Sequence, residues 1–211
     1  MTDAAVLHTL FGKIAEQEQS SGAERTAVAM RFPEREITLK DGRICILRPT
    51  APDVAEQMIE YLKKTSAETP WLLRNPDEVN YTLESEKEIL SGLLEDPYSA
   101  MIVAVVDGKV AGNCAINGIG RKRKIRHRCS MAIALYQAYW HLGIGTAMIG
   151  YLAELAKQIG YEQMDLEVIA GNEQAQALYR KCGFIESGRR HNAVKFDDGT
   201  YHDEILMYKE L

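Results

Sequence analysis

Two glycines, Gly143 and Gly145, separate a strand-like apolar run from a long amphipathic helix. Apolar residues recur at helical spacing from Ala147 to Ile159, and Gly160 is the kind of residue that commonly follows a helix end. Glycines let a ligand approach the backbone, and the first amides of a helix lack intrahelical partners and lie at the positive end of its dipole. The segment predicts a phosphate site, although a tight strand-to-helix turn would explain both glycines equally well.

Two common nucleotide-binding loops do not match this segment. A dinucleotide-binding loop needs a third small residue where this chain has Met148, which is too large for close packing of helix on strand. A Walker loop needs a Gly-Lys-Ser/Thr sequence, and none follows Gly145. A nucleotide-binding protein of another kind stays open as an alternative.

From residue 43 onward, strand-like and helical patterns alternate, which indicates an α/β domain built on one mixed sheet. Asp107-Gly108 and Asp198-Gly199 are typical of hairpin turns. Helices are expected to start at capping boxes over 50–53 and 85–88, and Asn172 is expected to cap another helix. The predicted strands cover 43–49, 101–106, 109–117, 128–136, 164–169, 184–196 and 200–209.

Charge and hydropathy limit the partners of the chain. It has 25 basic and 30 acidic residues, a net charge of −5, so no general attraction to nucleic acid or anionic lipid is expected. No apolar run reaches the length of about 18 residues that a membrane helix needs. The N-terminus lacks the pattern of a secretory signal, so we expect a cytoplasmic protein.

Two residue groups could suggest other partners. Six of the eight residues from Arg121 to Arg128 are basic, which fits either a nucleic-acid patch or a solvated turn between strands; the acidic composition favours the turn. The four cysteines are scattered without a C-x-x-C pair, so neither a disulfide nor a zinc site is expected.

Residues 1–35 differ from the rest of the chain. Apolar residues between Val6 and Ile14 recur at helical spacing and give way to a polar stretch, which predicts a helix and a linker ahead of a domain at 36–211. The helix either packs on its own domain or forms an arm to a partner subunit in a homodimer.

A second motif follows the glycine loop in the chain. Leu166–Asn172 leads into Ala175, Leu178-Tyr179 and Cys182–Phe184. Together the two motifs resemble the GNAT family of acetyl-CoA-dependent N-acyltransferases, over about residues 43–211. The resemblance implies a GNAT fold whose mixed sheet is splayed between the strand ending near Tyr136 and the strand starting near Met164, with acetyl-CoA in the opening.

The resemblance also assigns roles to particular residues. Tyr179 corresponds to the usual general acid, and a phenol can protonate a leaving thiolate. Asn172 is placed near the pantetheine or acyl group, and the backbone of Ile133 and Leu135 is expected to pair with the pantetheine arm. Trp140 departs from the family pattern, which has Gln or Arg there. The pyrophosphate contacts are assigned to His141, Leu142, Gly143, Ile144, Gly145 and Thr146.

The resemblance implies transfer of an acetyl group to a primary amine, but the acceptor is open between a small molecule and a protein amine. Acceptor choice in the family is expected to depend on the loops at 65–80 and 189–202. The general base is also open, either a water relay or one of Glu68, Glu84, His127 and Glu204. The alternative function is a sensor or partner-binding module that holds acyl-CoA without turning it over.

Overall fold

The computed structural model describes residues 32–211. The helices are α2 (Ala55–Glu68), α3 (Leu83–Glu95), α4 (Ile144–Ile159) and α5 (Glu173–Lys181), with 3₁₀ turns at Pro52–Val54, Pro76–Glu78 and Gln137–Tyr139. The strands are β1 (Arg35–Thr38), β2 (Ile44–Pro49), β3 (Ser99–Val106), β4 (Lys109–Gly118), β5 (Arg128–Leu135), β6 (Gln163–Ile169), β7 (Ile185–Lys195) and β8 (Tyr201–Glu210).

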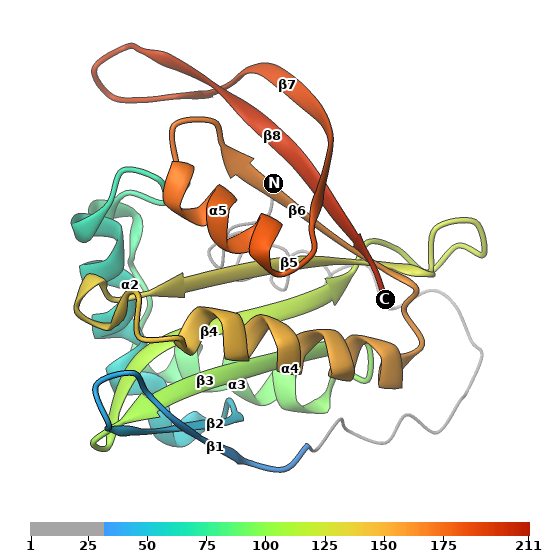
Figure 1. Ribbon diagram of the computed structural model, residues 1–211. Helices are drawn as coiled ribbons and strands as arrows, with labels where there is room; N and C mark the ends of the chain where they lie inside the picture. Colours follow the sequence, from blue (N-terminus) through green and yellow to red (C-terminus); the bar gives the residue numbers. More distant parts are fainter. Residues whose placement is uncertain (1–31) are drawn as a thin grey trace.

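All eight strands form one sheet in the order β1-β2-β3-β4-β5-β6-β8-β7. Every neighbouring pair is antiparallel except β5 and β6, which run parallel. Helices α4 and α5 cover one face of the sheet, whereas α2 and α3 lie on the other face (Figure 1). The expected α/β class and mixed sheet are therefore confirmed.

Each face of the sheet carries its own apolar core. The larger core contains α4 residues such as Met148 and Leu152, together with side chains of β2 to β6. The smaller core packs Met58 and Leu62 of α2 and Leu90 of α3 against β3, β4 and β5. Alternation along the strands supplies both cores, because successive side chains point to opposite faces.

Local turn signals in the sequence are largely confirmed. Asp107 and Gly108 both have positive φ, 51° and 75°, as the two central residues of a type I′ hairpin require. The seven predicted strands all form, with ends shifted by at most two residues. Gly160 closes α4 in the left-handed conformation, with φ of 102°.

Two predicted helix starts are wrong. Thr50 caps nothing, because the chain first makes the 3₁₀ turn at 52–54 and α2 begins at Ala55; Asp53 pairs instead with Arg48 of β2. Helix α3 begins one turn before the predicted start. Thr82 is its N-cap, and Ser85 is the third helical residue of the capping box, with the Ser85 amide donating to Thr82 Oγ1 over 3.1 Å.

The chain before β2 packs on the domain. Strand β1 falls across the expected domain start at residue 36, and Phe32 packs edge-on against Tyr151 of α4, with ring centroids 5.5 Å apart. The Tyr151 hydroxyl also donates to the Pro33 carbonyl. The helix expected near the N-terminus lies outside the described residues. Across 32–211, no helix is both long and apolar enough to cross a membrane.

Candidate active site

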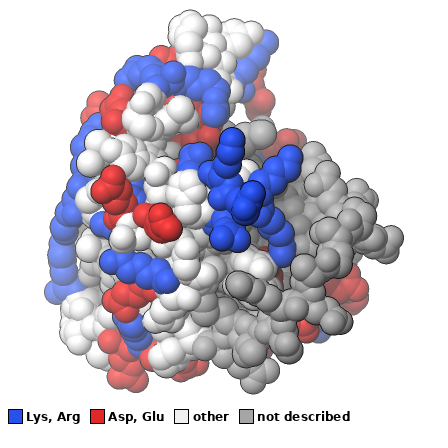
Figure 2. Space-filling model, turned by 90° about the vertical axis from the view of Figure 1, so that its right-hand side faces the viewer, with Lys and Arg blue, Asp and Glu red and all other residues white. Residues whose placement is uncertain are grey.

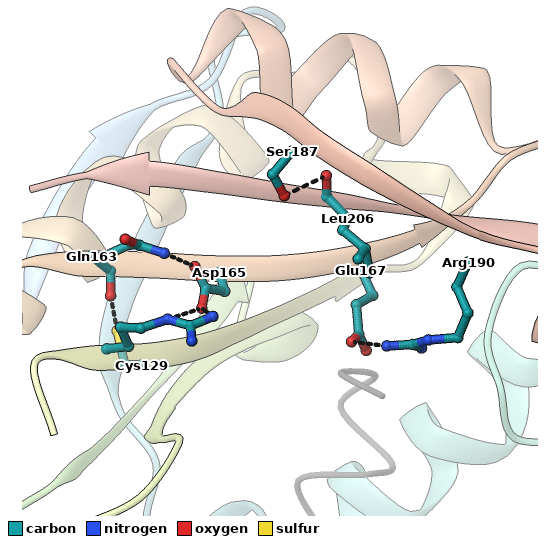
Figure 3. Close-up of polar contacts among 8 residues, drawn as sticks. Cys129, Gln163, Asp165, Glu167, Ser187, Arg190 and Leu206 are labelled. Atoms are coloured by element: carbon teal, nitrogen blue, oxygen red, sulfur yellow. Dashed lines mark hydrogen bonds and ion pairs between the residues drawn. The ribbon is translucent and has the colours of Figure 1, made fainter. Parts of the chain in front are cut away.

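The sheet opens between β5 and β6. These strands pair over only three residues each, Arg128–Ser130 against Gln163–Asp165, and then separate. Asp165 holds the closed end, because its two carboxylate oxygens accept from Arg128 Nε at 2.8 Å and Gln163 Nε2 at 2.6 Å (Figure 3). The predicted splay is therefore confirmed, and it lies where β5 continues toward Leu135.

The backbone of β5 presents donors to this opening. Arg128 accepts from Ile119 through its carbonyl and Tyr136 donates its amide to Ala111, so even-numbered residues of this stretch face β4. The His127 carbonyl accepts from the amides of Glu162 and Gln163, on the β6 side. By the alternation of an extended strand, the amides of Ile133 and Leu135 face the opening.

A cavity of about 660 Å³ fills the opening. Its volume is in the range of sites for a cofactor-sized ligand. The structure brings nearly all the predicted site residues together here: the cavity is lined by Ile133, Leu135, His141, Gly143, Ile144, Gly145, Thr146, Asn172 and Tyr179. Leu142 is the exception, since its side chain packs against the large core and its carbonyl accepts the Lys40 amide at 3.3 Å.

The two glycines of the loop are favoured at their positions for different structural reasons. Gly143 precedes α4 with φ of 100° and open space around it, so glycine is favoured by backbone conformation alone. Gly145 lies inside the helix, where an added Cβ would be 3.1 Å from Leu178 Cδ2 and 3.6 Å from Leu135 Cδ1. Gly143 thus allows the turn that aims the first helical amides at the cavity, and Gly145 allows α5 to pack close to α4.

Trp140 takes a defined position although it departs from the family pattern. Its indole Nε1 donates to the Leu135 carbonyl at 2.9 Å. This bond fixes the last residue of β5 to the turn that leads into the glycine loop. The Leu135 amide, which faces the opening, is not involved in it.

Asn172, which caps α5, and Tyr179, which lies within α5, are on the far wall of the cavity. The Asn172 side chain accepts the Ala175 amide at 3.1 Å, which confirms the predicted N-cap. Tyr179 is 8% exposed and packs edge-on against Phe184, with ring centroids 5.9 Å apart. It lines the cavity, so its phenol is both held by the core and within the opening.

Three carboxylates line the same cavity: Glu167 of β6, Glu173 of α5 and Glu204 of β8. Of these three, Glu204 is one of the bases expected from the sequence, whereas Glu167 and Glu173 are not. Arg190 of β7 donates to Glu167 Oε1 at 3.0 Å (Figure 3). It also donates to Glu204 Oε2 and so joins these two carboxylates. The pairing of β6 with β8 brings them together, placing Glu167 opposite Leu206 and Glu204 opposite Ile169.

The other candidate bases lie elsewhere. The Glu68 carboxylate accepts the Gln137 amide at 2.8 Å, and Glu84 is exposed in the first turn of α3. His127 lies at the closed end of the β5–β6 pair. None of these three is among the residues of 32–211 that line the cavity. Within the same residues, no group of three His, Cys, Asp or Glu side chains is arranged to hold a metal ion.

The cavity also has residues that the sequence did not single out. Lys40 and Lys181 line it and provide positive charge for a phosphate-bearing ligand. Trp71 lines it from the loop after α2 and approaches Gly171 so closely that an added Cβ there would be 2.5 Å from the indole. These contacts join segments far apart in sequence, so no local sequence pattern predicts them.

Comparison with known proteins identifies the family. The model of the acetyltransferase (GNAT) family matches residues 57–184. A candidate ribosomal protein bS18-alanine N-acetyltransferase of Bacillus subtilis is 33% identical over 116 residues, which are 55% of this chain and 72% of that protein. The ribosomal protein bS18-alanine N-acetyltransferase of Escherichia coli K12 is 36% identical over 75 residues, 36% of this chain and half of that protein.

The fold is also similar to that of a solved structure from this family. A crystal structure of a GNAT-family acetyltransferase from Streptococcus pneumoniae superposes with a TM-score of 0.75 at 24% identity, covering 79% of this chain and 99% of that chain. The family match covers more than half of the sequence and includes both the glycine loop and the α5 motif. The chain therefore belongs to the GNAT acetyltransferase family and is an N-acyltransferase with acetyl-CoA as its donor.

Proposed function

We propose that this protein transfers the acetyl group of acetyl-CoA directly to the free α-amine at the N-terminus of a protein. The observation that carries the proposal is that a single cavity contains the glycine loop, the outward-facing amides of β5, Tyr179 and the carboxylates Glu167 and Glu204. Donor binding, acid catalysis and attraction of a cationic acceptor can therefore take place in one space.

The donor would lie along the β5–β6 opening. Its pyrophosphate would accept hydrogen bonds from the amides that start α4, favoured by the helix dipole. Lys40 and Lys181 would add opposite charge at that end. The pantetheine arm would pair with the amides of Ile133 and Leu135, much as an added strand pairs with a sheet edge.

The reaction needs one bond to form and one to break. The lone pair of the amine nitrogen attacks the thioester carbonyl carbon, the carbon–sulfur bond breaks, and the thiolate takes a proton from the Tyr179 hydroxyl. Strand amides polarise the carbonyl oxygen as charge develops on it, as in an oxyanion hole. The depth of Tyr179 in the cavity wall supports this role, because burial holds the phenol in one orientation.

The acceptor amine arrives protonated and must lose a proton before attack. Glu167 and Glu204 provide negative charge for the ammonium group, and either carboxylate can take the proton directly or through water. Arg190 bonds to both and so fixes their orientation. Of the side chains expected from the sequence as bases, Glu204 alone lines the cavity within residues 32–211.

The relatives support an N-terminal acceptor, since two of them carry names that specify a ribosomal protein alanine. Such an acceptor would place the reaction in the cytoplasm. The carboxylates of Glu167 and Glu204 suit an α-ammonium group at a chain end, because that group is a cation attached to a peptide backbone.

The test compares two peptides that differ only at the N-terminus. Each has one internal lysine; the first begins with a free alanine and the second with an N-formylated alanine. Acetyl-CoA turnover, followed by thiol release, should occur only with the first peptide, and tandem mass spectrometry should place the acetyl group on the α-amine. Acetylation of the lysine, or thiol release without a peptide product, would contradict the proposal.

A further inference from the structure

Two charged side chains are buried between α2 and α3, beneath the loop that reaches the cavity. Arg74 is 6% exposed and Glu86 is fully buried. Burying a charge is costly unless other groups compensate it, so a buried arginine and glutamate call for a structural reason. Neither residue lines the cavity among the described residues, and the proposed reaction uses neither.

Arg74 fastens its loop to α2. Its Nε donates to Ser66 Oγ at 2.8 Å, and one terminal nitrogen donates to the Leu62 carbonyl at 3.2 Å. The Ser66 hydroxyl in turn donates to the same Leu62 carbonyl at 2.8 Å. The planar guanidinium therefore spans two acceptors on successive turns of α2, which a lysine ammonium cannot reproduce.

Glu86 of α3 belongs to the same buried environment. Burial raises the pKa of the Glu86 carboxyl to about 7, and the charge of Arg74 acts in the opposite direction. Tyr81 is the other titratable group that senses the pair: burial raises its pKa, the Arg74 charge lowers it and Glu86 raises it. The loop at 69–75, α2 and α3 thus meet around one arginine and its counter-charge.

The loop fastened in this way forms one wall of the cavity. Trp71, three residues before Arg74, lies against Gly171 and lines the cavity together with Leu72 and Leu73. Its ring also meets Phe196 and His202 near the β7–β8 turn, with centroids 6.1 and 6.2 Å away. The position of Trp71 therefore sets the distance between the two loops that are expected to choose the acceptor, at 65–80 and 189–202. We call the part of the cavity beside these loops the acceptor end.

We infer that Arg74 is a positioning residue for the acceptor: it holds the loop at 69–75 so that Trp71 closes the acceptor end of the cavity, with Glu86 as its buried counter-charge. This inference rests on the proposed function only in that the acceptor enters past Trp71. The donor end is formed by β5 and α4, which the Arg74 contacts do not touch.

The kinetic test uses Arg74→Lys and Arg74→Met, with Arg35→Met as the control, because Arg35 pairs with Glu154 of α4 away from the loop. The KM for the peptide amine should rise about ten- to hundredfold in both Arg74 variants, the range for losing hydrogen bonds to a charged group. The KM for acetyl-CoA should stay within about threefold of wild type. Equal changes in both KM values, or no change in either, would overturn the inference.

A second measurement needs no acceptor. In a Trp140→Phe background Trp71 is the remaining tryptophan, so its fluorescence reports the loop directly. Acrylamide should quench Trp71 more strongly in Arg74→Lys than in wild type. In wild type, quenching should also increase as pH falls through about 7, when Glu86 gains a proton and leaves the Arg74 charge uncompensated.

The control for this pH effect is on the same helix. Glu86→Gln should abolish the pH dependence of quenching, whereas Glu88→Gln, at an exposed position of α3, should keep it. Unchanged quenching in Arg74→Lys and a pH response that survives Glu86→Gln would overturn the inference. If wild type acetylates no peptide amine, the proposed function fails, and the quenching comparison still decides whether Arg74 holds the loop.

Discussion

Replacing Gly145 with valine should weaken acetyl-CoA binding by moving α5 relative to α4. The new Cβ would lie 3.1 Å from Leu178 Cδ2 and 3.6 Å from Leu135 Cδ1, so this atom alone already requires the Leu178 side chain to shift slightly. The two further methyl groups of valine would enter space that is already in van der Waals contact. Overpacking of this kind costs about 1–3 kcal/mol.

The displacement would reach both ends of the site. Leu178 directly precedes Tyr179, and Gly145 lies in the first turn of α4, whose amides face the cavity. We expect the dissociation constant for acetyl-CoA to rise at least tenfold, or about 1.4 kcal/mol. Gly145→Ala should give a smaller loss, because a single methyl needs only a slight shift of a flexible leucine.

Isothermal titration calorimetry measures the affinity, and circular dichroism checks that the fold is kept. Gly150→Val is the matched control, because Gly150 lies in the same helix with nothing within 4 Å of an added Cβ. Its affinity for acetyl-CoA should equal that of wild type. The reasoning would be refuted by a folded Gly145→Val protein that binds acetyl-CoA as tightly as the Gly150→Val control.

Three further changes test other parts of the structure. Tyr179→Phe should lower turnover at least tenfold and leave the acetyl-CoA dissociation constant within a few-fold of wild type, since general acid catalysis contributes a factor of about 10² to 10⁴ to the rate. Unchanged turnover at saturating amine would mean that Tyr179 has only a packing role. Urea unfolding should show that wild type loses on the order of 3 kcal/mol of stability as pH rises from about 4.5 to about 7, because the folded state holds the Glu86 proton more tightly than the unfolded chain. Glu86→Gln should flatten this dependence of stability on pH. An identical dependence in the variant would argue against the buried carboxyl. When serine replaces Arg121, Lys122, Arg123 and Lys124, acetyl-CoA turnover should stay within a few-fold of the wild-type rate. The wild-type protein should retard no RNA or DNA duplex at physiological salt.

The last of these changes concerns the basic turn between β4 and β5. The turn forms as expected, since the Ile125 and Arg126 amides both donate to the Lys122 carbonyl. Figure 2 looks onto the side of the molecule that carries this turn, where Lys and Arg side chains gather. Arg121 also lies over the ring of Tyr98, 4.3 Å from its centroid. A retarded duplex that the serine variant releases would make this surface a nucleic-acid site instead.

Features set by a few neighbouring residues were predictable from sequence. The hairpin at Asp107-Gly108 requires positive φ at two adjacent positions, and these residue types tolerate it. Asn172 caps α5 through a bond to the third residue along the chain. Competition between local signals caused the errors: Thr50 and Ser85 both looked like caps, but the tertiary path of the chain placed one before a 3₁₀ turn and the other inside a helix.

Features that depend on sheet order were not predictable. Glu167 and Glu204 are 37 positions apart in sequence, and only the antiparallel pairing of β6 with β8 places both at the cavity. Lys40 reaches the site because its amide bonds to Leu142, about a hundred positions away. The buried Glu86 gave no signal either, since its neighbours Ser85, Lys87 and Glu88 are polar and resemble an exposed helix face. Arg74 follows the apolar Trp71-Leu72-Leu73, but nothing in that run indicates which helix its side chain contacts.

The central claim is that acetyl-CoA occupies the opening between β5 and β6. Hydrogen–deuterium exchange, with and without acetyl-CoA, tests it directly. The account predicts slower exchange on adding acetyl-CoA in peptides covering 131–136 and 141–147, where the amides of Ile133, Leu135 and the first turn of α4 face the cavity. Exchange in the turn at 119–127 should be unchanged. Protection confined to that turn, or none at 131–136 and 141–147 at saturating acetyl-CoA, would contradict the account.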